Sequence, residues 1–149
     1  MALSDRIALL RNGALEQVAA PREIYSHPAT AYTAQFIGQT NLLRATVKDG
    51  SATCGSLKWP TSATDGSAVF SLRPEAIQIA SDVLPVSARY VRFRGAIHQQ
   101  IYGGANELLE IECGAGAGQM LRVRIPARSP LAGNQEFSFL ADDVVQVKG

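Results

Sequence analysis

The sequence predicts a mainly β protein built on a small, strongly bent β-barrel. Residues 87–102 alternate apolar and polar side chains with a period of two, which indicates one long strand with a mostly apolar face. Gly95 lies in the middle of that run, where the missing side chain permits a bulge or a sharp bend. Short strand-like segments separated by turn residues recur through the second half of the chain. One long strand that bends at a glycine and serves two sheet edges is typical of small barrels.

Residues 4–19 predict a β-hairpin. Two strand-like runs flank Asn12-Gly13, a strong short-range signal for a two-residue turn. The first run carries Ile7, Leu9 and Leu10, which is more apolar surface than a two-stranded ribbon can bury. We therefore expect these three side chains to be exposed, or to be covered by another surface such as a second copy of the chain.

Two short helices are expected after the hairpin. Pro21 opens the first, because proline is tolerated where the amide would be unpaired, and a proline seven residues later stops it. The second helix, over residues 29–37, ends at Gly38, a residue type favoured at helix C-caps. Tyr32 and Phe36 are four residues apart and should share one face of that helix.

A domain boundary is expected between Gly38 and Asn41, which divides the chain into residues 1–38 and residues 39–149. The strands expected in the second part are residues 41–47, 56–59, 69–72, 77–79, 87–102, 107–113, 120–125, 137–140 and 144–147. Pro74 interrupts this series where the apolar face changes phase, and a break is needed there because a one-residue slip exchanges the two faces.

The composition argues against a nucleic-acid-binding, a membrane-spanning or a secreted protein. Apolar residues make up 46% of the 149 residues and charged residues 18%, with a formal net charge of +1, so no global field favours nucleic acid or an anionic membrane. No apolar run reaches the ~20 residues of a membrane helix, and the first residues lack a signal-peptide pattern. Cys54 and Cys113 show no C-x-x-C spacing. We expect a soluble, cytoplasmic protein that meets a membrane only through a partner.

No pattern in the sequence supports catalysis. There is no G-x-S-x-G motif and no paired spacing of carboxylates, and His27 and His98 are the only histidines available as bases. His27 precedes a proline at a helix boundary, and His98 lies on the polar face of the long strand, so structural roles are favoured for both. We expect no catalytic residue, no metal site and no cofactor in this chain.

Motifs along nearly the whole chain follow one another in the order found in a single family. The first group is L-S-D-R-I-A-L-L at 3–10, N-G at 12–13, P-R-E-I-Y at 21–25, P-A-T at 28–30, F-I-G at 36–38 and T-N-L-L at 40–43. This group resembles the end of the ATP-binding domain of ABC importer ATPases of the maltose, polyamine, ferric-iron and sulfate type. The second group is L-R-P-E at 72–75, G-A-I at 95–97, Y-G at 102–103 and A-D-D-V-V-Q-V at 141–147. It resembles the transport-associated OB-like (TOBE) domain that follows.

The resemblance implies an OB-like barrel preceded by a hairpin and two helices left from an ATPase domain. The Walker A motif, the signature loop, the Walker B acidic pair and the switch histidine are not found, so this chain is not expected to hydrolyse ATP. ATP and Mg would belong to the parent subunit. In this family the barrels of two subunits pair, hold the dimer together and receive regulators. The resemblance also implies that the parent binds the transporter's membrane subunits at the cytoplasmic side of the inner membrane.

The candidate regulatory or interface residues are exposed positions near barrel turns. Arg73 and Glu75 lie beside the strand break, and Tyr102, Gly103 and Gly104 form the expected tip of a hairpin.

One alternative function is the binding of a small oxyanion. The layout of Ser87, Arg89 and Ser129 loosely resembles molybdate-binding TOBE domains, in which backbone amides together with serine and arginine donors could hold an anion. Tyr90 stands where that motif has an asparagine, which counts against this alternative.

A second alternative is an OB-type barrel that binds single-stranded nucleic acid. Tyr90, Arg92 and Arg94 could supply a charged stacking face. The near-neutral net charge and an aromatic content of 7% make nucleic acid an unfavourable partner.

Overall fold

The computed structural model describes residues 4–80, 89–114, 118–127 and 130–149. It is mainly β, as the sequence predicted. The hairpin is β1 (Ile7–Arg11) and β2 (Ala14–Ala19). The helices are α1 (Pro21–Ser26) and α2 (Ala31–Ile37). The barrel strands are β3 (Asn41–Lys48), β4 (Ser51–Cys54), β5 (Leu57–Pro60), β6 (Gly66–Leu72), β7 (Gln78–Ile79), β8 (Tyr90–Tyr102), β9 (Asn106–Cys113), β10 (Gln119–Pro126), β11 (Asn134–Leu140) and β12 (Val145–Val147).

The hairpin forms around the predicted turn. Asn12 and Gly13 adopt φ values of 50° and 80°, the left-handed conformation that a two-residue turn requires. The expectation that the apolar side chains of its first strand are exposed or covered by a second copy was wrong for Leu9, which is 5% exposed and packs with Ile24 of α1 in the same chain. Leu10, by contrast, is 60% exposed. The helices therefore supply a partner for one face of the hairpin.

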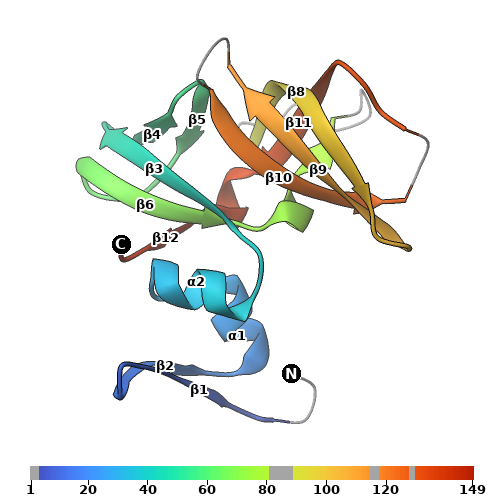
Figure 1. Ribbon diagram of the computed structural model, residues 1–149. Coiled ribbons are helices and arrows are strands. Elements are labelled where there is room, and N and C mark those ends of the chain that lie inside the picture. The colour runs from blue at the N-terminus through green and yellow to red at the C-terminus, as the bar shows by residue number, and fades with distance from the viewer. Residues whose placement is uncertain (1–3, 81–88, 115–117, 128–129) are drawn as a thin grey trace.

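The two helices lie between the hairpin and the barrel (Figure 1). α2 begins two residues later than predicted, because the Thr30 side chain accepts the amide hydrogen of Thr33 at 3.1 Å and caps the helix. Gly38 follows α2, but its φ of 178° is extended backbone and not the left-handed cap expected. The rings of Tyr32 and Phe36 stack with centroids 5.8 Å apart, which confirms their shared face.

β8 is the long strand that the alternating pattern predicted, and it does serve two neighbours. Its first half pairs with β11 and its second half with β9, in a sheet of order β10-β9-β8-β11-β7. The apolar face was predicted to continue to Ile101, which is wrong, because the register shifts between Ile97 and Gln99. This bulge reverses the faces, so Ile101 is 41% exposed.

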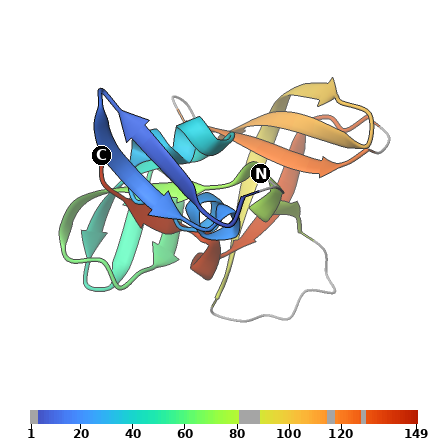
Figure 2. The same cartoon turned by 90° about the horizontal axis from the view of Figure 1, so that it is seen from below.

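The second sheet has the order β12-β6-β3-β4-β5 and encloses one core together with the first. β4 is a strand that the sequence interpretation missed. Trp59 and Phe70 of this sheet meet edge to face at 5.3 Å, and Phe93 and Phe137 of the other sheet stack at 5.7 Å. Figure 2, seen from below, shows the hairpin and helices across the underside of this barrel.

Residues 38–40 carry the chain from α2 into β3, at the point where the sequence placed a domain boundary. The division into domains of residues 1–38 and 39–149 stays a prediction.

Candidate functional site

Arg73 lies at the junction of the helices and the barrel. It follows β6 directly, and only 8% of its surface is exposed. Its guanidinium donates five hydrogen bonds to backbone oxygens of Tyr25 (2.9 and 3.3 Å), Ala34 (2.8 Å), Gly38 (3.2 Å) and Gln39 (3.0 Å). It also lies over the Tyr25 ring, 4.2 Å from the centroid. The sequence interpretation placed this arginine on the surface, and that was wrong.

Through these bonds, one side chain supplies hydrogen-bond donors to carbonyl oxygens near the C-terminal ends of both helices. The last carbonyls of a helix have no partner within the helix, and they carry the negative end of its dipole. Tyr25 lies near the end of α1 and Ala34 in the last turn of α2, so a cation between them is stabilised by both. Burial nevertheless lowers the pKa of Arg73 from its ordinary value.

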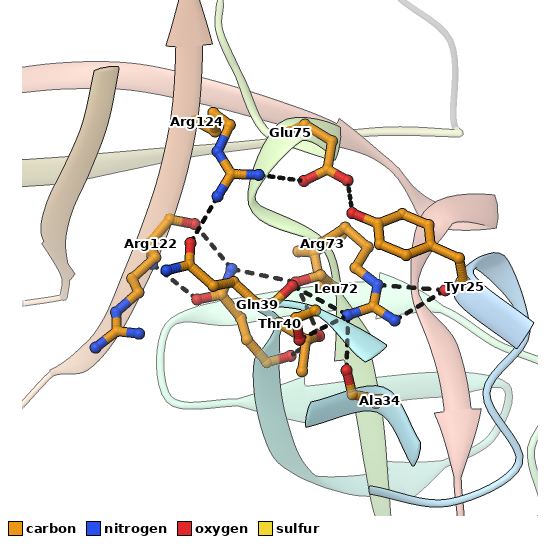
Figure 3. A network of polar contacts seen from close by, with 11 residues as sticks. Tyr25, Ala34, Gln39, Thr40, Leu72, Arg73, Glu75, Arg122 and Arg124 are labelled. Carbon is orange, nitrogen blue, oxygen red and sulfur yellow. Dashed lines mark hydrogen bonds and ion pairs between the residues drawn. The ribbon is translucent and has the colours of Figure 1, made fainter. Parts of the chain in front are cut away.

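Glu75 extends this network to the opposite sheet. The Tyr25 hydroxyl donates a hydrogen bond to one Glu75 oxygen, and Arg124 of β10 lies 3.7 Å from the other (Figure 3). Arg124 also donates to the Gln39 side chain at 2.6 Å. We call the set Tyr25, Gln39, Arg73, Glu75 and Arg124 the Arg73 joint.

Asn41 connects the two sheets beside this joint. Its side-chain nitrogen donates to the carbonyl oxygens of Leu72 (3.2 Å) and Arg122 (2.9 Å), and its side-chain oxygen accepts the Arg122 amide hydrogen at 2.7 Å. Asn41 belongs to β3 and Arg122 to β10, the edge strand of the other sheet. One amide side chain therefore satisfies both backbone groups of an edge residue, as a neighbouring strand would.

The chain's last residues make a second connection to the helices. The Lys148 amide donates to the Ala29 oxygen at 3.0 Å, and the Ala31 amide donates to the Lys148 oxygen at 2.8 Å. Lys148 follows β12, so the barrel holds the segment between α1 and α2 at a point other than the joint.

The predicted hairpin tip forms a separate surface at the end of β8 and β9. Tyr102 is 73% exposed, and Gly104 has a φ of 91°, which favours glycine. The Gly103 amide donates to the Asn106 oxygen at 2.9 Å and closes the turn. Within the described part of the chain, no hydrogen bond or ion pair joins this tip to the Arg73 joint.

The Tyr25 hydroxyl gives the joint a pH dependence that can be measured. Burial, followed by the hydrogen bond to Glu75 and the Glu75 charge, raises the pKa of Tyr25 above 10.0. A raised pKa contributes stability that is present below the ordinary value and is lost as pH rises through the folded-state value. We therefore expect the Tm to fall more between pH 9 and pH 11 in the natural chain than in Tyr25→Phe. Parallel curves for the two proteins would contradict this.

Comparison with known proteins shows what this chain is similar to. It is 34% identical over 155 residues to the spermidine/putrescine import ATP-binding protein PotA of Pseudomonas aeruginosa, covering 97% of this chain and 41% of that protein. It is 34% identical over 122 residues to the Fe(3+) ions import ATP-binding protein FbpC 2 of Rhodococcus jostii, covering 80% and 33%. The glucose import ATP-binding protein GlcV of Saccharolobus solfataricus matches 56% of the chain at 34% identity, and the match covers 24% of that protein.

The chain is homologous to part of the ABC importer ATP-binding subunits. It spans less than half the length of these relatives. No protein-family model matches it. Among solved structures, the cytoplasmic molybdate-binding protein ModG is similar with a TM-score of 0.60 at 14% identity, over 73% of this chain and 96% of that one. This likeness supports an OB-like, TOBE-type fold for the barrel of this importer-subunit relative.

The structure does not show the residues predicted to bind an oxyanion coming together as a site. Ser87 and Ser129 lie outside the described residues. Arg89 is exposed and lies 3.5 Å from the Asp142 carboxylate. A carboxylate beside the guanidinium opposes the binding of an anion there.

Groups that could carry catalysis are dispersed. Among residues 4–80, 89–114, 118–127 and 130–149, no cluster of three or more His, Cys, Asp or Glu side chains could hold a metal ion. His98 lies 2.8 Å from Glu112 on the exposed face of β8, and His27 contacts its neighbour Ser26 at 2.9 Å. Within those same ranges, no helix is long and apolar enough to cross a membrane.

Both cysteines are buried, and their reactivity can be predicted. Burial, with smaller contributions from Cys54 and Glu112, raises the pKa of Cys113 to about 12. Burial also raises the pKa of the Cys54 thiol. Because the thiolate is the reactive form, we expect iodoacetamide at pH 8 to leave the folded chain unmodified. Mass spectrometry should show two adducts after unfolding in concentrated urea, and rapid labelling of the folded chain would contradict the assignment.

Proposed function

We propose that this chain is a regulatory and dimerising part of an ABC importer ATP-binding subunit. The alignment with PotA over 97% of the chain carries the proposal, since it includes the helices and the barrel together. The solute would belong to the polyamine, ferric-iron, sugar or sulfate class, and the names of the relatives include the first three of these. This part of the subunit would not itself be catalytic. ATP and Mg would bind elsewhere in the parent, which would be cytoplasmic and held at the inner membrane by the transporter's membrane subunits.

The hairpin tip is the surface that we assign to dimerisation. Tyr102 exposes a large ring at the end of the longest strand, and tyrosine is enriched among residues that dominate interface energetics. The glycines beside it leave the backbone of the turn accessible to a partner. A second barrel of the same kind is the partner expected for a homodimer.

Sedimentation equilibrium of the chain tests this assignment. We expect a reversible dimer, and Tyr102→Glu should weaken it by about tenfold or more, because a charge would be buried at the contact. Gln99→Glu places the same charge on an exposed position of the same strand and should leave the dimer unchanged. A natural chain that stays monomeric, or a dimer that is indifferent to Tyr102→Glu, would contradict the proposal.

A second exposed apolar surface lies on the hairpin and α2, and it supports the proposal that this chain is part of a longer subunit. Leu10 and Leu15 are register partners in the hairpin and are 60% and 62% exposed. Arg11, next to Leu10, lies over the Tyr32 ring, which stacks on Phe36, itself 63% exposed. We propose that a nucleotide-binding domain of the parent subunit covers these side chains.

The likeness of the barrel to the molybdate-binding protein ModG favours one other candidate function, the binding of a small oxyanion. Calorimetric titration of the chain with molybdate, tungstate and sulfate tests it. We expect no heat of binding, because Arg89 faces a carboxylate. Saturable heat that is lost in Arg89→Gln would replace the regulatory proposal with the oxyanion one.

A further inference from the structure

We infer that Arg73 fastens the hairpin–helix segment to the barrel as one rigid body, so that residues 38–40 act as a fixed connection and not as a flexible linker. A displacement of the barrel would then displace the helices by the same motion. This coupling is a property of the chain itself and does not depend on which solute an importer carries or on whether the barrels pair.

The first support is that every residue of the connection is bonded to the barrel. The carbonyl oxygens of Gly38 and Gln39 accept hydrogen bonds from Arg73 at 3.2 and 3.0 Å. The Gln39 side chain accepts from Arg124 of β10. The Thr40 hydroxyl lies 2.7 Å from the Ser71 hydroxyl of β6. A flexible linker would leave its backbone groups to water, whereas Arg73 binds two backbone oxygens of this connection, and Arg124 and Ser71 bind two of its side chains.

The second support is steric. A Cβ atom added at Gly38 would lie 3.2 Å from Cε2 of the Tyr25 ring and 3.8 Å from Arg73 Nη1. The Tyr25 ring in turn lies under the Arg73 guanidinium. The connection is therefore packed between α1 and the arginine, and it has no room to swing without displacing that ring.

The third support is the chemistry of the Arg73 guanidinium. A guanidinium presents five N–H donors in a rigid planar fork, and Arg73 directs them to four carbonyl oxygens on two helices and the connection. A lysine has three donors on one nitrogen and cannot reach all four oxygens. Because the arginine is buried, moving the helices away would break these bonds together and leave an unpaired charge.

Two separate attachments fix an orientation, whereas one would allow rotation about it. Arg73 holds the ends of both helices, and Lys148 holds Ala29 and Ala31 through backbone hydrogen bonds after β12. Leu9 of the hairpin packs on Ile24 of α1, so the hairpin moves with the helices. The hairpin, the helices and the barrel therefore form one mechanical unit.

Hydrogen–deuterium exchange of the full chain tests the role of Arg73. In Arg73→Lys, we expect amides in residues 21–40 to exchange about tenfold faster or more, while peptides that contain Leu109 or Val123 in the barrel core keep their natural rates. Arg122→Lys is the matched control. Its side chain is 54% exposed and has an ion pair of 3.9 Å to Glu110, so exchange should stay natural throughout.

Three results would overturn the inference. Natural exchange rates in residues 21–40 of Arg73→Lys would mean that the arginine does not fasten the segment. Equal acceleration in the segment and the barrel core would mean that it supports the whole fold. If Arg73→Lys does not fold, the natural chain replaces it, and amides in residues 21–40 are expected to exchange within about tenfold of those in the barrel core, because one rigid body opens as a unit. Much faster exchange in residues 21–40 than in peptides that contain Leu109 or Val123 would overturn the inference.

Discussion

Asn41→Ala is expected to lower the free energy of unfolding of the chain by about 2–4 kcal/mol, because each buried backbone group that loses its partner costs about 1–3 kcal/mol. The substitution leaves the Arg122 amide and carbonyl without the bonds that Asn41 makes at 2.7 and 2.9 Å. It also removes a donor from the Leu72 oxygen. Asn41 itself is only 7% exposed, so these bonds are made by a side chain that lies between β3 and β10.

Urea unfolding followed by Trp59 fluorescence measures this effect, because Trp59 is the chain's single tryptophan and lies in the barrel core. Asn106→Ala, at an exposed asparagine, is the control and should change the midpoint little. Asn41→Asp keeps the shape and the acceptor but removes the donor, so it should also destabilise at pH 7. A loss below about 0.5 kcal/mol in Asn41→Ala would mean that the two sheets do not depend on this side chain.

The parts of the fold that the sequence predicted are those set by local chemistry. The Asn12-Gly13 turn and the helix opened by Pro21 depend on residues a few positions apart. The long strand is visible because the alternation of apolar and polar residues holds over its first half. The bulge after Ile97 gives no such signal, because an inserted residue shows only as a loss of pattern, and Gln99 and Gln100 fit either phase.

The candidate site was predicted only in part, because its contacts are distant in sequence. Arg73 and Glu75 were predicted as surface residues, which holds for the exposed Glu75 but not for Arg73, since an arginine before a proline at a strand end is usually solvated. The carbonyl oxygens that accept hydrogen bonds from Arg73 lie 34–48 residues earlier in the chain. Asn41 was missed entirely. The one available signal was a polar side chain at an alternation position that otherwise faces the core, in line with Leu43 and Ala45.

Gly95→Val is expected to destabilise the chain by about 1–3 kcal/mol, the usual cost of adding carbons to a filled core. A Cβ at this position would lie 3.1 Å from Cδ1 of Ile111 and 3.3 Å from Cε2 of Phe137. Gly95 pairs with Cys113 of β9 and with Gln135 of β11, so the backbone is held on both sides and cannot retreat. The isoleucine end can move by a few tenths of an ångström, but the stacked phenylalanine ring cannot move as easily.

Gly95→Ala separates the effect of losing the glycine's backbone freedom from the steric cost of a larger side chain. Replacing a strand glycine by alanine gains roughly 0.5–1 kcal/mol through the lower entropy of the unfolded chain, which is close to the cost of the small shift needed. We therefore expect Gly95→Ala to lie within about 1 kcal/mol of the natural chain and only Gly95→Val to fall clearly below it. Ala96→Val, on the opposite face of β8, is the control and should be tolerated. If Gly95→Val is as stable as the natural chain, the close approach of β8 to Ile111 and Phe137 does not limit the barrel, and the glycine is present for another reason.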